Sequence, residues 1–217
     1  KYARSFFGGM DVKYGINEAF TLDVTLVPDF GQVIFDNQVL NTSPFELQFN
    51  ENRQFFTEGM ELFNKSGIFY SRRVGVQAPW EVLKTNLKQD EVISGIQGMP
   101  QLYNASKFSG RTKKGLGIGV FNAISAPSTG SAYNTVTNET REFLAAPLTN
   151  YNTVVFDQNL RQNSSFTLTN TNVLREGNFY DANVTALNSN VNFKDNLYFV
   201  NGKATLSQKF KSQQNEV

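Results

Sequence analysis

Three glutamates, Glu51, Glu58 and Glu61, lie within one short stretch and are the residues best suited to acid–base chemistry. Two carboxyl groups about 5–9.5 Å apart can hydrolyse a glycosidic bond, one as the acid and the other as nucleophile or base. Nearby arginines offer the alternative that these carboxylates form structural ion pairs. Because spacing along an irregular stretch does not fix separation in space, the sequence favours the structural interpretation.

Metal and cofactor chemistry has little support in the sequence. The chain of 217 residues contains no His and no Cys, which removes imidazole bases, thiolate nucleophiles, iron–sulfur clusters and His-ligated zinc. Asp36-Asn37 and Asp195-Asn196 could offer oxygen ligands to calcium, but no loop of the EF-hand type surrounds either pair. The glycine-rich run at 115–119 lacks the spacing and the following helix of a nucleotide loop. We therefore expect no metal and no cofactor.

The composition points to β-structure without a nucleic-acid partner. The net charge is +1, whereas proteins that bind nucleic acid usually present a basic face. Charged residues make up 18%, below the roughly 25% typical of soluble domains, and 20 residues are Phe. Many aromatics among uncharged polar residues favour strands with polar turns. No stretch approaches the roughly 18 apolar residues of a transmembrane helix, and barrel strands would not produce one.

The first clear element is a β-hairpin. Residues 10–16 and 20–26 alternate apolar and polar side chains, and Asn17-Glu18-Ala19 forms a short polar turn. Lys13 and Asp23 lie on the non-apolar face, which indicates that this face is wet. The pattern favours an antiparallel sheet with one solvated face, and the alternative is a barrel wall that is apolar outside and polar toward a lumen.

Residues 28–110 lack a sustained period and are predicted as an irregular segment, apart from a short strand at 68–75. Pro28 ends the second arm of the hairpin because proline cannot donate to a strand ladder. No regular pattern is found at 95–110 either. A segment of this length is too long for an ordinary loop. We expect a functional, self-packed segment or a small subdomain.

Strand patterns return over residues 111–217. Gly117 and Gly119 alternate with apolar residues, which predicts close approach by another group on that face. Residues 126–131 are predicted as a loop. Short polar turns join the strands, so the all-β fold is predicted as an antiparallel up-and-down meander. The predicted strands are 115–123, 151–157, 165–173, 182–193 and 197–206.

Several motifs occur in the order found in one bacterial family. They are Asp11-Val12-Lys13-Tyr14-Gly15-Ile16, Thr21-Leu22-Asp23, Pro28-Asp29-Phe30-Gly31-Gln32-Val33, Asp36, Phe45-Glu46, Glu51-Asn52-Arg53-Gln54-Phe55-Phe56-Thr57-Glu58, Leu62-Phe63 and Phe69-Tyr70-Ser71-Arg72-Arg73-Val74-Gly75. Through them the chain resembles a Bacteroidota outer-membrane family of unknown function, densely over residues 9–75 and weakly beyond. In that family the domain usually follows a module similar to family-nine carbohydrate-binding domains.

The resemblance implies a large outer-membrane β-barrel in contact with lipid, of which this chain would be the first portion. The chain opens at Lys1 within an apparent strand, so we expect an excised piece with the hairpin at 1–27, the irregular segment at 28–110 and barrel strands at 111–217. The sugar-binding module would precede Lys1, so glycan contacts through it cannot be assigned to residues of this chain. The family offers no established catalytic residues to transfer.

A wide barrel leaves a lumen that a segment can fill. We therefore predict that residues 29–75 fold inward as a plug, with Phe55 and Phe56 in a small internal core and arginines paired to carboxylates. The predicted cluster comprises Glu46, Glu51, Arg53, Phe55, Phe56, Glu58, Arg72 and Arg73.

Three functions stay open at this point. The leading hypothesis is a non-enzymatic protein of the bacterial outer membrane, active in surface binding or passage of glycans or other nutrients and in contact with other outer-membrane proteins. The second is a soluble β-sandwich that binds carbohydrate. The third is a glycoside hydrolase that uses the carboxylates of the irregular segment. A sandwich would bury its aromatics between two sheets, whereas a barrel would expose an apolar band with aromatics at its borders.

Overall fold

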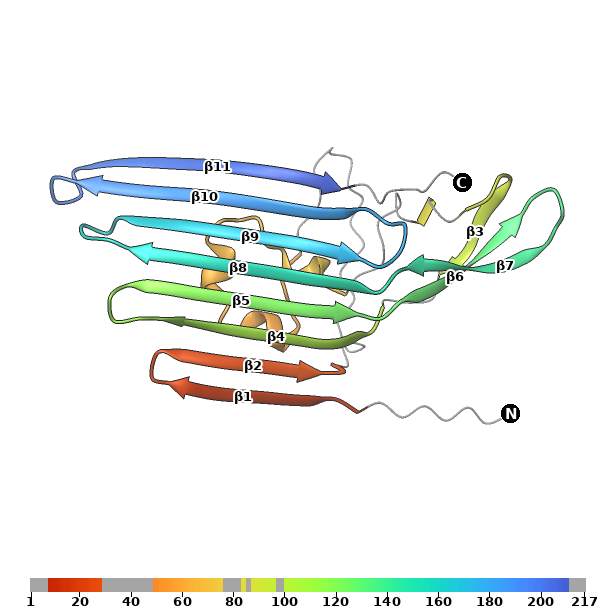
Figure 1. Ribbon diagram of the computed structural model, residues 1–217, viewed down its shortest axis with the longest axis horizontal. Helices are drawn as coiled ribbons and strands as arrows, with labels where there is room; N and C mark the ends of the chain where they lie inside the picture. Colours follow the sequence, from red (N-terminus) through yellow and green to blue (C-terminus); the bar gives the residue numbers. More distant parts are fainter. Residues whose placement is uncertain (1–7, 29–48, 76–82, 85–86, 97–99, 211–217) are drawn as a thin grey trace.

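The computed structural model describes residues 8–28, 49–75, 83–84, 87–96 and 100–210, and the fold is almost entirely antiparallel β-structure (Figure 1). No helix in these ranges is long and apolar enough to cross a membrane. The first part of the predicted plug, residues 29–48, lies outside the described residues.

One large sheet dominates the molecule. It has eight strands in the order β1-β2-β4-β5-β8-β9-β10-β11, and every neighbouring pair is antiparallel. The predicted antiparallel meander is confirmed. The strands are β1 (Met10–Asn17), β2 (Phe20–Leu26), β4 (Leu102–Arg111), β5 (Leu116–Ser125), β8 (Thr149–Asn159), β9 (Ser165–Arg175), β10 (Asp181–Phe193) and β11 (Tyr198–Phe210).

The turns of the large sheet follow from local residue chemistry. The Asn17 side chain accepts hydrogen bonds from the backbone amides of Ala19 and Phe20, at 2.8 and 3.0 Å, which closes the β1–β2 turn. Lys194, Asp195 and Asn196 all have positive φ between β10 and β11. Both hairpins lie where the sequence predicted them, because alternation and turn chemistry agree there.

A smaller sheet of three strands has the order β3-β6-β7. The chain runs from β5 into β6 (Ser128–Asn134), returns through β7 (Thr140–Ala146) and enters β8, so one long hairpin contributes to both sheets (Figure 1). The strand β3 (Glu91–Ile96) pairs with β6. The prediction of a loop at 126–131 was therefore wrong beyond Pro127, since pairing on both sides holds these small residues in a strand.

The two faces of the large sheet have different surroundings. One face, which we call the covered face, lies against residues 49–75, and the other, the open face, has no layer over it among the described residues (Figure 1). Alternation assigns each side chain to a face, so partners such as Ile118 and Phe156 share the open face while Gly119 and Val155 share the covered face.

Residues 49–75 form a compact segment with little regular structure, hereafter the inner segment. It contains α1 (Gln54–Thr57), α2 (Glu61–Asn64) and a 3-10 turn, η1 (Ser71–Arg73). The predicted strand at 68–75 was wrong because this stretch turns through η1 instead of extending. The predicted irregularity at 95–110 was also wrong, because β3 and β4 occupy much of the range from 91 to 111.

The main core lies between the inner segment and the covered face. The buried apolar residues come from α1, α2 and their flanks on one side and from β4, β5 and β8 on the other. They are Phe56, Met60, Leu62, Phe63, Val74, Leu102, Ala105, Phe121, Ala123 and Val155. A second, smaller cluster under the three-stranded sheet contains Leu83, Ala132, Phe143 and Ala145.

Candidate functional site

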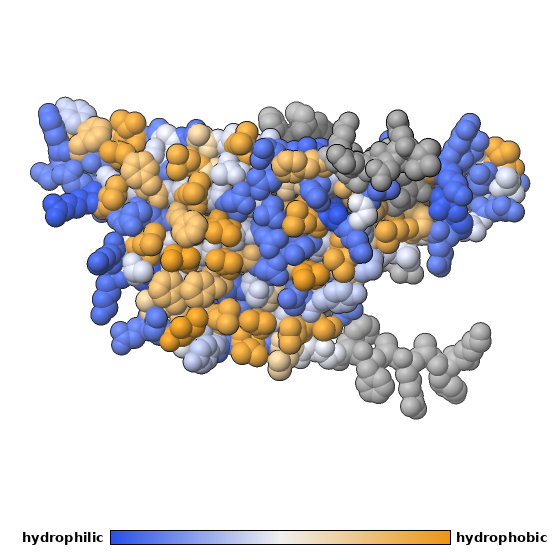
Figure 2. Space-filling model, in the orientation of Figure 1, coloured by the Kyte–Doolittle hydropathy of each residue, from blue (hydrophilic) through white to orange (hydrophobic). Residues whose placement is uncertain are grey.

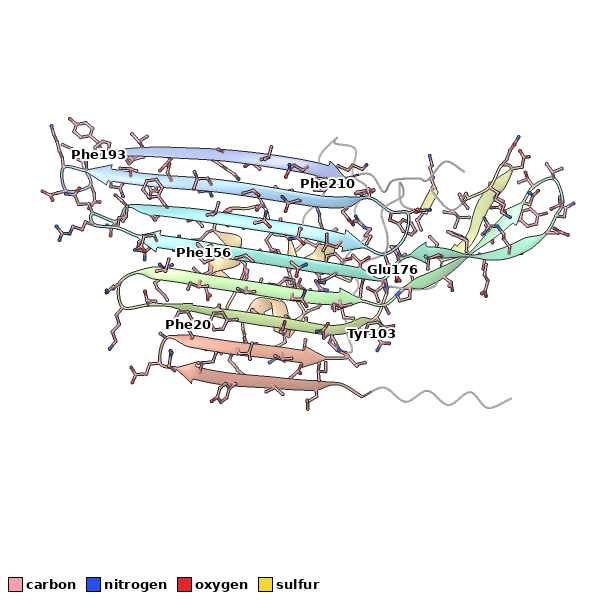
Figure 3. The ribbon with its side chains drawn as sticks, in the orientation of Figure 1. Phe20, Tyr103, Phe156, Glu176, Phe193 and Phe210 are labelled. Carbon is pink, nitrogen blue, oxygen red and sulfur yellow. The ribbon has the colours of Figure 1, made fainter. Side chains whose placement is uncertain are left out.

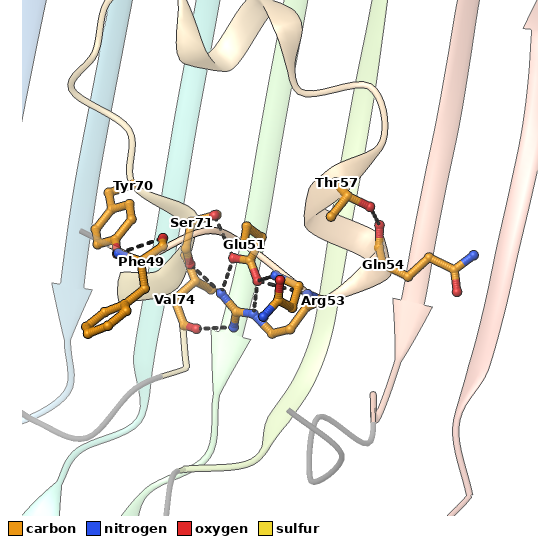
Figure 4. A network of polar contacts seen from close by, with 9 residues as sticks. Phe49, Glu51, Arg53, Gln54, Thr57, Tyr70, Ser71 and Val74 are labelled. Atoms are coloured by element: carbon orange, nitrogen blue, oxygen red, sulfur yellow. Dashed lines mark hydrogen bonds and ion pairs between the residues drawn. The ribbon is translucent and has the colours of Figure 1, made fainter. Parts of the chain in front are cut away.

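A bidentate ion pair folds the inner segment back on itself (Figure 4). The Arg53 Nε and Nη2 groups donate to the two carboxylate oxygens of Glu51 at 2.9 and 2.8 Å. The same guanidinium also donates to the backbone oxygens of Val74 and Ser71, each at 2.7 Å. Because these carbonyls end the segment, one arginine holds its beginning and its end together.

The carboxylate of Glu51 is fully engaged in this network. It accepts the Ser71 hydroxyl at 2.6 Å and the backbone amide of Arg53 at 3.0 Å. Burial alone would raise the pKa of Glu51, but the hydrogen bonds from Arg53 and Ser71 outweigh burial and hold that pKa below its usual value. This environment suits a structural anion, and it leaves no lone pair of Glu51 directed at an open site.

Lys107 of β4 attaches the inner segment to the sheet near α1. Its side chain is 1% exposed, and its ammonium group donates to the backbone oxygens of Phe55 at 2.8 Å and Glu58 at 2.5 Å. The Asp23 carboxylate lies 3.3 Å from the same nitrogen, which balances the buried charge. Lys107 therefore fixes the end of α1 to the covered face.

Asp157 of β8 is a second attachment point and has a side chain with no exposed area. Lys65, which follows α2, donates to it at 2.6 Å, and Thr167 of β9 donates at 2.7 Å. Arg111 of β4 also forms an ion pair with this carboxylate. The buried Asp157 carboxylate thus joins Lys65 of the inner segment to the strands β4, β8 and β9.

The inner segment also contacts the last three strands of the large sheet. The hydroxyls of Ser66 and Thr169 lie 2.5 Å apart, and Lys203 of β11 donates to the Ser66 carbonyl at 2.9 Å. Asn188 of β10 donates to the Lys65 carbonyl at 3.4 Å. Together with Lys107 and Asp157, these bonds attach one short segment to strands from β4 to β11.

Apolar packing fills the space between these polar attachments. A Cβ on Gly119 would lie 3.1 Å from the Phe63 ring, and a Cβ on Gly117 would lie 2.8 Å from Leu62. The predicted close approach over the alternating glycines is therefore confirmed. Phe63 and the edge of Phe121 form a T-shaped pair with centroids 6.4 Å apart.

The predicted cluster is only partly brought together. Phe55 and Phe56 contact each other edge to face and pack toward Phe121, as the internal core required. Glu58 does not join the arginines, because it pairs with Lys13 of β1 at 2.8 Å in an exposed position. Glu46 lies outside the described residues.

The two neighbouring arginines of the predicted cluster stack on aromatic rings. The Arg72 guanidinium carbon lies 5.7 Å from the Phe49 ring centroid, and that of Arg73 lies 5.8 Å from Tyr70. Glu61 is exposed at the start of α2. Within the described ranges, no group of three or more acidic side chains is arranged to hold a metal ion.

Sequence reasoning missed the lysines and Asp157 that attach the inner segment. Lone lysines in alternating strands usually belong to solvated faces, so Lys107 and Lys203 carried no distinctive signal. One signal did exist, because Lys107 alternates with Ala105 and Ser109, which places a cation on a face of small residues. That pattern could be used only after residues 102–111 were recognised as a strand.

A cavity of about 520 Å³ lies beside the inner segment. Its lining comes from residues 68–74 on one side and from β8, β9 and β10 on the other, and it includes four aromatic rings and two arginines. The aromatic and arginine residues are Phe69, Tyr70, Tyr151, Tyr180, Arg73 and Arg175.

Comparison with known families places the chain in one of them. A family described as a domain of unknown function, DUF5916, matches residues 1–217. The chain belongs to this family. The resemblance to a family of unknown function is thus confirmed at that level. No curated protein and no solved structure matches the chain.

Proposed function

We propose that this member of DUF5916 forms part of the wall of a non-enzymatic outer-membrane β-barrel, with the inner segment folded into its lumen. In this proposal the barrel works in surface binding or passage of glycans or other nutrients. One observation carries the proposal: the large sheet exposes rows of apolar side chains on its open face, and on its covered face it buries charged side chains beside a small apolar core. Barrels in lipid have this inverted polarity, whereas soluble sheets bury their apolar side.

The open face offers apolar side chains to its surroundings. Ile118, Phe156, Leu168 and Leu187 lie in one row across β5, β8, β9 and β10. Phe156 is 45% exposed and Leu187 is 48% exposed, although neither has a polar tip. Figure 2 shows a broad apolar area over this side of the sheet. A contiguous exposed apolar surface of this kind requires a cover, and lipid is the cover proposed here.

The apolar area runs obliquely across the strands. The row through Asn122 begins with Val12 and Val24 on β1 and β2. Toward β11 the same row is entirely amide, ending in the pair Asn183 and Gln208. A row perpendicular to the strands is therefore apolar at one edge of the sheet and polar at the other. Barrel strands tilt by about 35–45°, so a level lipid band must cross such rows obliquely.

The amides of this row are bonded to one another. Asn122 donates to Asn150 and Asn152, each at 2.7 Å, and Asn152 donates to Asn172 at 3.1 Å. Asn183 donates to Gln208 at 3.2 Å. Polar side chains next to lipid are tolerated when they find partners among themselves. This row of bonded amide side chains suits the border between the lipid core and the headgroups.

Aromatic side chains support the same arrangement. Phe20, Phe156 and Phe193 lie toward the β1–β2 and β10–β11 hairpin ends of the sheet, while Tyr103 and Phe210 lie toward its opposite end (Figure 3). Aromatic girdles border the lipid band of membrane barrels. Exposed aromatics disfavour the β-sandwich alternative. Among the described residues, the layer over the covered face is the inner segment and not a second sheet.

Spin labels on β10 test the proposal, because residues 1–217 contain no Cys that would react elsewhere in this region. Leu187→Cys places a label on the open face, and Asn190→Cys places one on the opposite side of the same strand, where the side chain is also exposed. In phospholipid vesicles containing the full-length protein, the label at 187 should collide with oxygen and avoid a water-soluble nickel chelate. The label at 190 should do the reverse.

The matched pair makes the outcome decisive. A soluble sandwich would not partition into the vesicles, and its label at 187, packed between two sheets, would be shielded from both the nickel chelate and oxygen. Either result would contradict the proposed membrane wall. Swelling of the same vesicles in oligosaccharide solutions then measures passage, with empty vesicles as the control.

A further inference from the structure

The cavity beside the inner segment has the size of a small-ligand site. Its volume of about 520 Å³ falls within the roughly 300–1,000 Å³ of typical ligand pockets. Its walls belong to two different parts of the chain, the inner segment and the strands β8 to β10. Because both parts are fixed by the bonds described above, the cavity is preformed.

Aromatic rings stand on both walls of the cavity. Phe69 and Tyr70 come from the inner segment, while Tyr151 and Tyr180 come from the sheet side. Such rings offer flat apolar faces, which suit the C–H faces of a pyranose ring. Thr153 and Thr171 also line the sheet wall, where Thr153 donates to the Thr171 hydroxyl at 3.0 Å and Thr171 donates to the Asn152 carbonyl at 3.3 Å.

Two arginines give the cavity a positive character. Arg175 donates from Nη1 to the Tyr180 carbonyl at 2.6 Å, and its guanidinium carbon lies 4.6 Å from the Tyr180 ring centroid. These contacts orient the guanidinium plane at the cavity wall. Arg73 belongs to the facing wall. The described lining includes no Asp or Glu, so the site favours an anion.

We propose that this cavity binds an acidic sugar, a pyranose ring that carries a carboxylate, between the aromatic walls and the two arginines. This inference rests on the proposed function, since a ligand reaches the covered face only if that face lines a passage. It goes further by naming the ligand class and the residues. The ring faces select a sugar over a simple carboxylate, and the arginines select a charged sugar over a neutral one.

Calorimetry on the full-length protein in detergent micelles tests this site with three probes. Methyl glucuronide should bind, methyl glucoside should bind at least about tenfold more weakly, and acetate should show no binding. Equal binding of glucuronide and glucoside would overturn the role of the arginines. Equal binding of acetate and glucuronide would overturn the role of the rings, and no binding of glucuronide would overturn the site.

A matched pair of arginine variants locates the binding. Arg73→Gln should weaken glucuronide binding about tenfold and leave glucoside binding unchanged. Arg161→Gln, at an exposed turn outside the cavity, should leave both unchanged. If the two variants behave alike, the cavity is not the site. The spin-label measurement at 187 and 190 is independent of these results, so failure of sugar binding with the expected labels would refute this inference alone.

Discussion

On the covered face of the large sheet, charged side chains are buried and bonded to another part of the chain, whereas on the open face apolar side chains are exposed and amides bond only to their neighbours. Lys107 and Asp157 are almost inaccessible on the first face, while Leu187 and Phe156 are about half exposed on the second. The contrast shows that the sheet exposes apolar side chains on one face and buries charged side chains on the other. The buried charges of the covered face are satisfied by the inner segment, and the apolar side chains of the open face depend on their surroundings.

Asp157→Ala should break this contrast most strongly, because it removes the buried anion that Lys65, Thr167 and Arg111 share. We expect the free energy of unfolding to fall by about 3 kcal/mol. This is at the lower end of the cost of breaking a buried ion pair, because Lys65 and Arg111 are each about a third exposed. Urea titration in detergent micelles measures the change. Gln158→Ala, the next residue on the opposite face, should cost less than about 0.5 kcal/mol. Equal losses would contradict the contrast.

Gly119→Ala should test the close approach of the inner segment. Its new Cβ would lie 3.1 Å from the Phe63 ring within a packed core, so we expect a loss of about 2 kcal/mol in the free energy of unfolding. Gly15→Ala on β1 is the matched control, because nothing lies within 4 Å of its Cβ position. The same titration compares them. A tolerated Gly119→Ala would mean that the segment is not held against β5.

Acid should loosen the inner segment while leaving the open face intact. Because hydrogen bonds hold the pKa of Glu51 below its usual value, its stabilisation is complete above the unfolded pKa of about 4.3 and is lost as pH falls through the lower folded pKa. Glu51→Gln should cost about 1 kcal/mol at neutral pH and flatten the stability profile at acid pH. Limited proteolysis across pH 7 to 3 follows the segment.

Glu58→Gln is the control for this acid experiment. Lys13 lowers the pKa of Glu58 through a hydrogen bond and their opposite charges, but both side chains are more than half exposed. Solvent and salt screen such pairs, so we expect no measurable change in the unfolding midpoint at neutral pH. A loss of stability as large as that of Glu51→Gln would show that exposed ion pairs, and not the ion pair and hydrogen bonds of Arg53, hold the inner segment.

Alternation and turn chemistry were sufficient to predict β1, β2 and β8 to β11. These strands are long, and a slip by one residue would exchange their two faces, so the sequence specifies them locally. The strand β6 could not be predicted in this way. Its Ser128, Thr129 and Gly130 favour turns by themselves, and only pairing with β3 and β7 extends them.

The candidate site was predictable in kind but not in detail. Adjacent Glu51 and Arg53 indicated a bidentate pair, and the glycines of β5 indicated a close neighbour. The partners of Lys107 and Lys65 lie 49 and 92 residues away in sequence, where no local pattern reports a contact. The cavity depends on how the segment lies on the sheet, so its aromatic walls could not be derived from spacing.

The bonds between the inner segment and the last strands also set an order of events during synthesis. Lys203 reaches the Ser66 carbonyl across 137 residues of chain, so the segment leaves the ribosome long before its final partners exist. Its bonds to Asp157, Thr169, Asn188 and Lys203 can form only after β8 to β11 have aligned. Contacts of such long sequence separation slow folding. Docking of the inner segment is therefore completed late in folding, after the strands of the large sheet have paired.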